Sequence, residues 1–88
     1  MEWVLVHWVD IVSCEHPWMD EADARELRPA EMWSTGIIIH QDQSCVVLAG
    51  TYMVTDRTCG NVNAIPRGVI KSIRQLSPVE PRSIGGDD

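Results

Sequence analysis

The sequence has few of the features that would place the chain in a membrane or cross-link it through disulfide bonds. No apolar run approaches the roughly 20 residues that a membrane-spanning helix needs, and the short run Trp3 to Val6 has no basic stretch ahead of it. We therefore expect no membrane partner and no export signal. The cysteines number only three, and an odd number in a short chain fits a reducing compartment better than a disulfide scaffold. These features predict a cytoplasmic protein.

Motifs of strong chemical specificity are also missing. No two cysteines are closer than fourteen residues, so the paired spacing of a structural zinc site is absent. Cys14 and His16 alone offer a weak pair of metal ligands. The chain contains the residue types for nucleophilic catalysis, cysteine, serine and histidine, without a recognisable signature. We therefore predict a protein that is not an enzyme, with no catalytic residue, no metal ligand and no cofactor.

The charge is unevenly distributed along a chain that is long enough for one domain only. Eighty-eight residues give a thin core, which makes self-association a reasonable expectation. The formal net charge is −6, with −7 in residues 1–42 and +3 in residues 43–76. The acidic total argues against duplex DNA as a partner. The separation of charge suits head-to-tail assembly or a small anionic ligand on the basic side, although unrelated solvated charges would give the same count.

The distribution of β-branched and apolar residues predicts a mainly β protein. The strands predicted from it are residues 3–9, 32–40, 45–54, 62–65 and 69–76. Both alternate faces of the first strand are apolar, so we expect it to be covered on two sides. The second and third strands form a hairpin around a polar turn. Gly36 and Gly50 interrupt its two arms, where glycine often marks a bulge or a sharp bend.

Residues 66–76 fit either a helix or a strand by their spacing. Gly68 decides the interpretation, because a glycine inside so short a helix would cost roughly 1 kcal/mol. We therefore predict a single 3₁₀ turn over Pro66–Gly68 and a strand after it. The remaining residues, 77–88, have the composition of a disordered tail.

One short helix is predicted at about residues 20–28. Asp20 can cap its start, Arg25 and Arg28 fall in its last turn, and Pro29 ends it. The segment has few apolar side chains. We therefore expect the helix to lie on the body of the protein as a lid and to contribute little to the core.

Five short strands with a 3₁₀ turn before the last one predict a small, strongly bent antiparallel barrel over residues 1–76. This order resembles the small barrels of the Src-homology and Sm-like types, whose last two strands are joined by such a turn. The chain is also similar to short, functionally uncharacterised proteins of phages and prophages. The residues that carry the likeness are Trp8-Val9-Asp10, Ser13, Trp18, Ser34-Thr35-Gly36, Val46-Val47-Leu48-Ala49, Ile65-Pro66-Arg67, Ile70, Ile73, Arg74 and Leu76. The resemblance implies fold and phage origin, hence the host cytoplasm, and lends no reaction. The turn His16-Pro17-Trp18 departs from the small-residue-Gly-Trp turn of that group.

The candidate binding residues are tryptophans and basic side chains, which are favoured in interaction hot spots. They are Trp18, Trp33, Arg57, Arg67, Lys71 and Arg74. Core packing is the alternative role for Trp18 and Trp33, which flank the predicted helix. Lys71 and Arg74 would face opposite sides of an ideal strand unless that strand twists or bulges.

These residues support two functional hypotheses. In the first, the protein self-associates and docks to a host or phage protein as an accessory or anti-defence factor. In the second, an oligomer sequesters an anionic, nucleotide-like signal with Arg57, Arg67 and a stacking tryptophan.

Overall fold

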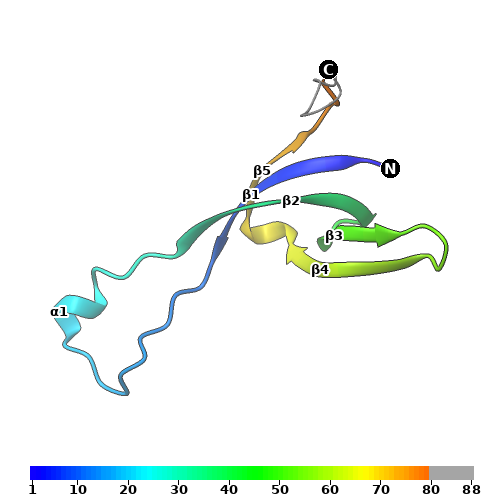
Figure 1. Ribbon diagram of the computed structural model, residues 1–88. Helices are drawn as coiled ribbons and strands as arrows, with labels where there is room; N and C mark the ends of the chain where they lie inside the picture. The colour runs from blue at the N-terminus through cyan, green and yellow to red at the C-terminus, as the bar shows by residue number, and fades with distance from the viewer. Residues whose placement is uncertain (80–88) are drawn as a thin grey trace, which may run out of the picture.

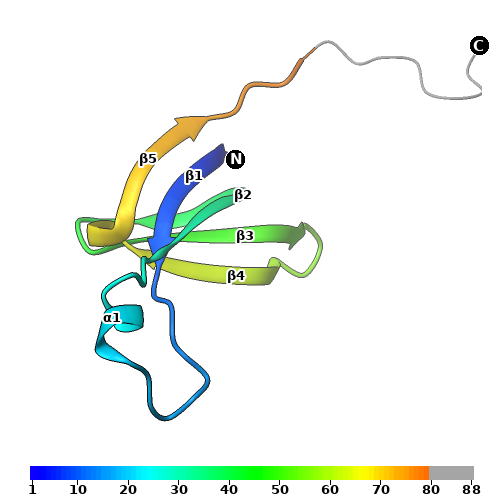
Figure 2. The same ribbon diagram turned by 90° about the vertical axis from the view of Figure 1, so that its left-hand side faces the viewer.

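The computed structural model describes residues 1–79, in which five antiparallel strands form one sheet in the order β4-β3-β2-β1-β5. The elements in chain order are β1 (Trp3–Asp10), α1 (Glu21–Ala24), β2 (Ala30–Gln41), β3 (Cys45–Met53), β4 (Thr58–Pro66), the 3₁₀ helix η1 (Arg67–Val69) and β5 (Ile70–Gln75). The prediction of a mainly β fold with one short helix between the first two strands is confirmed (Figure 1). The sheet curls strongly, as Figure 2 shows, but β4 and β5 remain its two edges, so the described strands do not close the predicted barrel.

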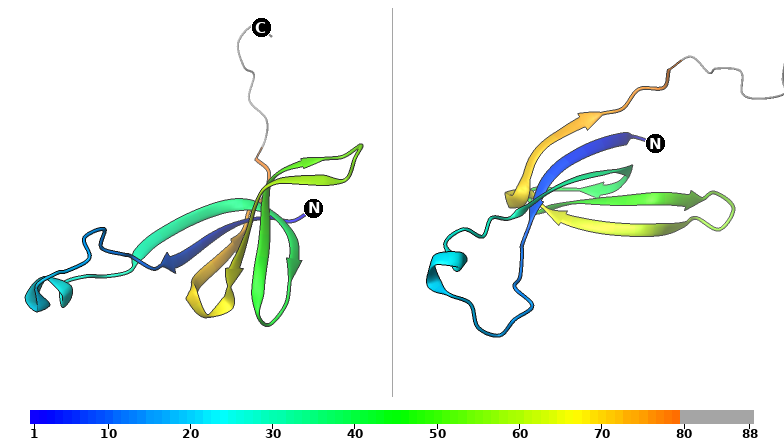
Figure 3. Two further views of the ribbon diagram at one scale, coloured as in Figure 1. Left: turned by 90° about the horizontal axis from the view of Figure 1, so that it is seen from below. Right: turned by 60° about the vertical axis from the view of Figure 1, so that its left-hand side comes forward.

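The curl of the sheet depends on β2, the longest strand. Its first part pairs with β1 from Ala30 to Ile37, and its last part pairs with β3 from Ile37 to Gln41. Gly36 is the residue before the pairing with β3 begins, and a Cβ there would lie only 2.7 Å from the backbone oxygen of Ala49. Glycine therefore allows β2 and β3 to approach closely at this point. Figure 3 shows the curvature of the strands from two further sides. A register shift follows directly after Ile38, as expected for a strand that bends.

The core lies on one face of the curled sheet. The buried residues that pack together are Val4, Val6, Val46, Leu48 and Ile65, with Trp8, Ile38, Val69, Ile70 and Ile73 partly buried against them. The expectation that β1 is covered on both sides is wrong, because its intervening residues Leu5 and His7 are only half-buried and Trp3 is exposed. An antiparallel sheet of this size commonly buries one face and leaves the other solvated.

The helix is shorter than predicted, and it does not lie on the body of the protein. It covers Glu21–Ala24 only, has no buried residue, and Asp20 at its N-cap position makes no capping bond with its side chain. A helix that short is marginal unless an apolar face packs it onto the body, and this segment offers no such face. Figure 1 shows α1 far from the sheet, at the end of a long extension, so it is not a lid on the body.

After β3, the order of the elements agrees with the prediction, a strand, a 3₁₀ turn and a final strand. The 3₁₀ turn begins one residue later than expected and is followed by the strand β5, so the helical alternative for residues 66–76 is wrong. β4 is longer than expected because the loop before it is confined to residues 54–57. Residues 77–79 have no regular structure, and the rest of the predicted disordered tail lies outside the described residues. Among the described residues, no helix is long and apolar enough to cross a membrane.

Candidate functional site

Residues 11–29, which we call the arm, leave the sheet and return to it at one point. β1 ends at Asp10 and β2 begins at Ala30, and these two residues pair with each other. The arm between them contains α1 and extends away from the strands (Figure 1). Not one of its nineteen residues is buried, and Cys14 is the single one that is even half-buried. The arm therefore contributes no side chain to the core.

Large apolar side chains on the arm are nevertheless exposed. Trp18 is 89% exposed and Ile11 is 84% exposed, and Val12, Met19 and Leu27 are exposed as well. An open hollow at the arm is lined by Cys14, His16, Trp18, Met19, Asp20 and Asp23. Trp18 does not pack in the core, so the alternative role considered for it from the sequence does not hold. Large apolar side chains left exposed on a small protein are favoured at interaction surfaces.

The arm carries a net negative charge. Five acidic residues and two arginines give residues 11–29 a formal charge of −3. Arg25 forms an ion pair with Glu21, its Nε donating to the carboxylate at 3.0 Å. Arg28 donates to two backbone carbonyls, those of Arg25 at 3.0 Å and Leu27 at 2.8 Å. Arg25 is therefore paired with a carboxylate, whereas Arg28 keeps its charge because backbone carbonyls are neutral. The four remaining acids against Arg28 leave the arm with a net charge of −3.

A second group of polar and aromatic residues lies on the face of the sheet opposite the core. His7 of β1 and Trp33 of β2 are cross-strand partners, and their rings stack with centroids 4.1 Å apart and an interplanar angle of 9°. The Nε2 atom of His7 lies 2.8 Å from Oε1 of Glu31, and Nζ of Lys71 lies 3.4 Å from the same oxygen. These hydrogen bonds, first from His7 and then from Lys71, lower the pKa of Glu31 below its usual 4.5.

A bulge in β5 places both of its basic residues on this face. The register between β1 and β5 shifts by one residue between His7 and Trp8. Lys71 is the additional residue, and its ammonium group reaches the carboxylate just described. Arg74 pairs with Leu5, whose side chain points away from the core because both neighbours in β1 are buried. The sequence allowed Lys71 and Arg74 to share a face only if the strand bulges, and it does. We call the set Leu5, His7, Glu31, Trp33, Lys71 and Arg74 the outer face.

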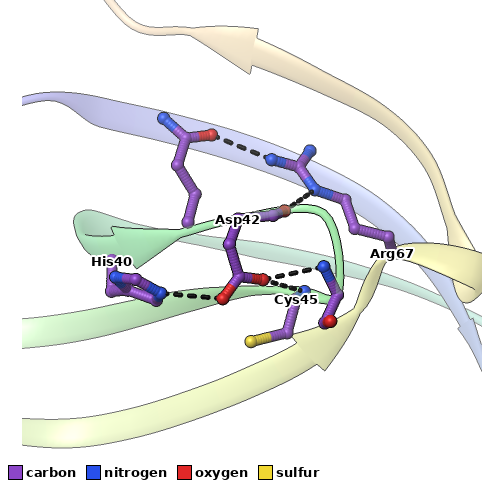
Figure 4. A network of polar contacts seen from close by, with 6 residues as sticks. His40, Asp42, Cys45 and Arg67 are labelled. Carbon is purple, nitrogen blue, oxygen red and sulfur yellow. Dashed lines mark hydrogen bonds and ion pairs between the residues drawn. The ribbon is translucent and has the colours of Figure 1, made fainter.

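The turn between β2 and β3 is organised by Asp42 (Figure 4). One oxygen of its carboxylate accepts the backbone N–H groups of Ser44 at 2.7 Å and Cys45 at 2.9 Å. The other oxygen lies 2.9 Å from Nε2 of His40. The hydrogen bond with His40, followed by those from the two backbone groups, lowers the pKa of Asp42 to about 2. The turn is therefore stabilised by an ionised carboxylate.

Arg67 connects η1 to that same turn. Its Nε donates to the backbone oxygen of Asp42 at 2.9 Å, and its Nη2 donates to the side-chain oxygen of Gln41 at 3.1 Å. Its backbone N–H also donates to the carbonyl of Ser44 at 2.9 Å. Figure 4 shows the guanidinium group directed at the turn. Arg67, which the sequence predicted as a ligand-binding residue, thus makes structural hydrogen bonds within the chain.

The six residues predicted to bind are distributed over four places. Trp18 lies on the arm. Trp33, Lys71 and Arg74 share the outer face. Arg57 lies in the turn between β3 and β4 with a φ of 56°, and Arg67 bonds to the turn between β2 and β3.

Sequence reasoning missed His7 and Glu31, which complete the outer face. Their role follows from the register of β1 against β2, in which Trp33 faces His7 and Glu31 faces Val9. Pairing residues 3–10 with residues 30–37 as strands across the arm would have brought them together.

The cysteines are all free, with Cys14 and Cys45 half-buried and Cys59 exposed. Over residues 1–79, no three histidine, cysteine, aspartate or glutamate side chains gather in a way that could hold a metal ion. The histidine hydrogen bonds described above go to carboxylates, His7 to Glu31 and His40 to Asp42.

Fold and site together define a small open β-sheet protein with a projecting, acidic arm that exposes five large apolar side chains. Comparison of the chain with protein-family models, with curated proteins and with solved structures finds no match. Its function is therefore inferred from the geometry of the arm and the outer face.

Proposed function

We propose that this chain is a non-enzymatic protein-binding module that docks on another protein through its arm. The observation that carries the proposal is the 89% exposure of Trp18 on a segment with no buried residue. Tryptophan supplies a large, rigid contact area and is enriched among the residues that dominate binding energy. An arm that contributes nothing to the core and displays such a side chain is best explained as a docking element.

The arm suits a protein partner better than a small ligand. The hollow beside Trp18 is open, and the chain around it is a loop that a partner surface can enclose. We extend the proposal to an accessory or anti-defence factor that acts on a host or phage protein in the host cytoplasm, which is the role that the phage origin expected from the sequence would imply. A docking arm provides the contact that such a role requires.

The second hypothesis, sequestration of an anionic nucleotide-like signal, draws less support from the geometry. Arg67 is hydrogen-bonded within the chain, and Arg57 lies in a turn on a different loop from the one that carries Trp18. Trp33, Lys71 and Arg74 remain as a basic and aromatic surface on which such a ligand could lie.

Affinity capture with three forms of the full chain tests the proposal. The wild type, Trp18→Ala and the control Val54→Ala would be used under identical conditions; Val54 is also exposed, at 76%, but lies in the turn between β3 and β4. We expect the wild type and the control to retain the same protein and Trp18→Ala to lose it. Equal capture by Trp18→Ala would contradict the proposal. A small molecule released on denaturation and detected by mass spectrometry, with no protein captured, would support sequestration instead.

A further inference from the structure

The arm and the outer face are neighbours on the chain and carry opposite charge. The arm begins where the pair Asp10–Ala30 closes the ladder between β1 and β2, and the stacked pair His7–Trp33 lies three positions along the same ladder. The arm has a formal charge of −3. The outer face has Lys71 and Arg74 against Glu31 and therefore one excess positive charge.

Both surfaces also expose apolar residues that nothing in the described chain covers. Trp33 is 56% exposed on the outer face, and Trp18 is 89% exposed on the arm. Leu5 is half-buried beside Arg74. Each surface thus offers an exposed tryptophan, and the two surfaces differ in net charge, with −3 on the arm and one excess positive charge on the outer face, so they are complementary to each other.

We propose that the partner of the arm is a second copy of this chain, in a symmetric dimer where each arm lies on the outer face of the other copy. This inference rests on the proposed function, since it names the protein on which the arm docks. In a two-fold dimer the same patch is used on both copies and must be self-complementary. An acidic surface and a basic surface on the same copy, which are the arm and the outer face, meet that condition because each can face its counterpart on the other copy.

The size of the patch is adequate for a stable dimer. At their observed exposures, Trp18 and Trp33 together present roughly 300 Å² of side-chain surface, taking about 200 Å² for a whole tryptophan. A standard interface buries about 800 Å² on each partner. Two tryptophans therefore supply more than a third of it, and the rest can come from the exposed apolar residues of the arm, which are Ile11, Val12, Met19 and Leu27. The charge pairs fix the orientation of the arm on the face.

Sedimentation equilibrium of the full chain tests this inference. We expect a dimer at micromolar concentration for the wild type and for the control Val54→Ala. Because a dimer contains two copies of each anchor, Trp18→Ala should weaken the association constant at least about 100-fold. Arg74→Glu should weaken it by roughly 5- to 30-fold, since two partly exposed charge contacts are reversed. Far-ultraviolet circular dichroism would check that each variant keeps the fold.

A compensating variant separates a charge contact from a general loss of structure. Asp23→Lys and Glu26→Lys, introduced together with Arg74→Glu in one chain, make the arm basic and the outer face acidic. We expect this triple variant to associate more tightly than Arg74→Glu alone.

Two results would overturn the inference. One is a wild-type chain that remains monomeric at about 100 µM. The other is a dimer that Trp18→Ala leaves unchanged. If the chain is monomeric but Trp18→Ala still loses a captured protein, the proposed function stands and only the identity of the partner is wrong. If neither self-association nor capture depends on Trp18, both proposals fail.

Discussion

Gly36 lies so close to β3 that a Cβ at this position would be only 2.7 Å from the backbone oxygen of Ala49. Gly36→Ala therefore forces β2 and β3 apart at the bend, and we expect it to lower the free energy of unfolding by about 1–3 kcal/mol. Gly68→Ala is the matched control, because a Cβ there would meet nothing within 4 Å. Urea denaturation of both variants measures the difference. Equal effects of the two substitutions would mean that the close approach at Gly36 does not constrain the sheet.

The carboxylate of Asp42 makes stability depend on pH in the acid range. Its pKa is about 2 in the folded chain against an ordinary 3.8. A carboxyl group whose pKa is lowered by folding stabilises the native state above its ordinary pKa, and this stabilisation is lost as the pH falls through the folded value. The stabilisation should thus be complete above about pH 4 and disappear towards pH 2.

Asp42→Asn tests that window, since an asparagine oxygen can still accept the backbone N–H groups of Ser44 and Cys45 but carries no charge. We expect the wild type to have the higher melting temperature at pH 5 to 6 and the two proteins to converge towards about pH 2. Thermal unfolding followed by circular dichroism between these values makes the comparison. A constant difference across the range would assign the effect to the shape of the turn and not to the charge.

Substitutions of Arg67 and Arg57, both of which the sequence predicted to bind a ligand, should change the stability of the chain in opposite directions. Arg67→Ala removes the hydrogen bonds to Asp42 and Gln41 and should destabilise the chain by roughly 0.5–1.5 kcal/mol. Arg57 has a φ of 56°, a left-handed conformation that costs a side-chain-bearing residue about 1–2 kcal/mol. Arg57→Gly relieves that cost and should stabilise the chain by roughly 0.5–1 kcal/mol, after the added freedom of glycine in the unfolded state is subtracted. Denaturant titration of both variants gives the two signs, and a stabilising Arg67→Ala would contradict the role assigned to Arg67.

At the scale of the elements, the strands and the 3₁₀ turn could be predicted because their signals are local. The polar segment between two β-branched runs identified the hairpin of β2 and β3, and Gly68 decided between helix and strand after β4. The extent of α1 could not be predicted, because capping residues give a helix a start but only packing against the body extends it. The position of the arm could not be predicted for the same reason, because none of its side chains packs in the core.

The outer face was only partly predictable for a related reason. Trp33, Lys71 and Arg74 were selected by residue type, which favours tryptophan and basic side chains at interfaces. Whether they share a face depends on the bulge at Lys71 and on the register that sets Trp33 opposite His7. Register is a property of paired strands and not of one segment, so a residue-by-residue scan placed neither His7 nor Glu31 beside the predicted ones.

Because the arm contributes no side chain to the core, the sheet should fold without it. Asp10 and Ala30 pair at its base, so residues 11–29 can be replaced by Asn-Gly, the dipeptide preferred in two-residue hairpin turns. We expect the shortened chain to keep the β-sheet circular dichroism spectrum and a melting temperature close to that of the wild type. Loss of the folded spectrum would show that the arm stabilises the sheet.

At the scale of the whole molecule, two electrostatic effects act on self-association in opposite directions. Each copy carries a formal net charge of −6, which makes the copies repel each other. The arm and the outer face attract each other locally in the proposed dimer. Salt decides between them, since the screening length is about 30 Å at 0.01 M, about 10 Å at 0.1 M and about 3 Å at 1 M. The repulsion between the net charges of the two copies acts over a distance comparable to the size of the molecule. The attraction between the arm and the outer face acts over the distance of a single contact. Moderate salt therefore screens the repulsion before it screens the attraction.

We therefore expect the association constant to pass through a maximum as salt is raised. Between about 0.01 and 0.1 M it should rise, because the net repulsion is screened, and towards about 1 M it should fall, because the contacts of Arg74 and Lys71 with the arm are screened as well. Sedimentation equilibrium over this range measures the curve, and Arg74→Glu is the control, which should show a smaller decrease at high salt. A purely apolar interface behaves differently, since it loses nothing when charges are screened. An association constant that only increases up to 1 M would therefore exclude charge complementarity between the arm and the outer face, whatever the dimer looks like.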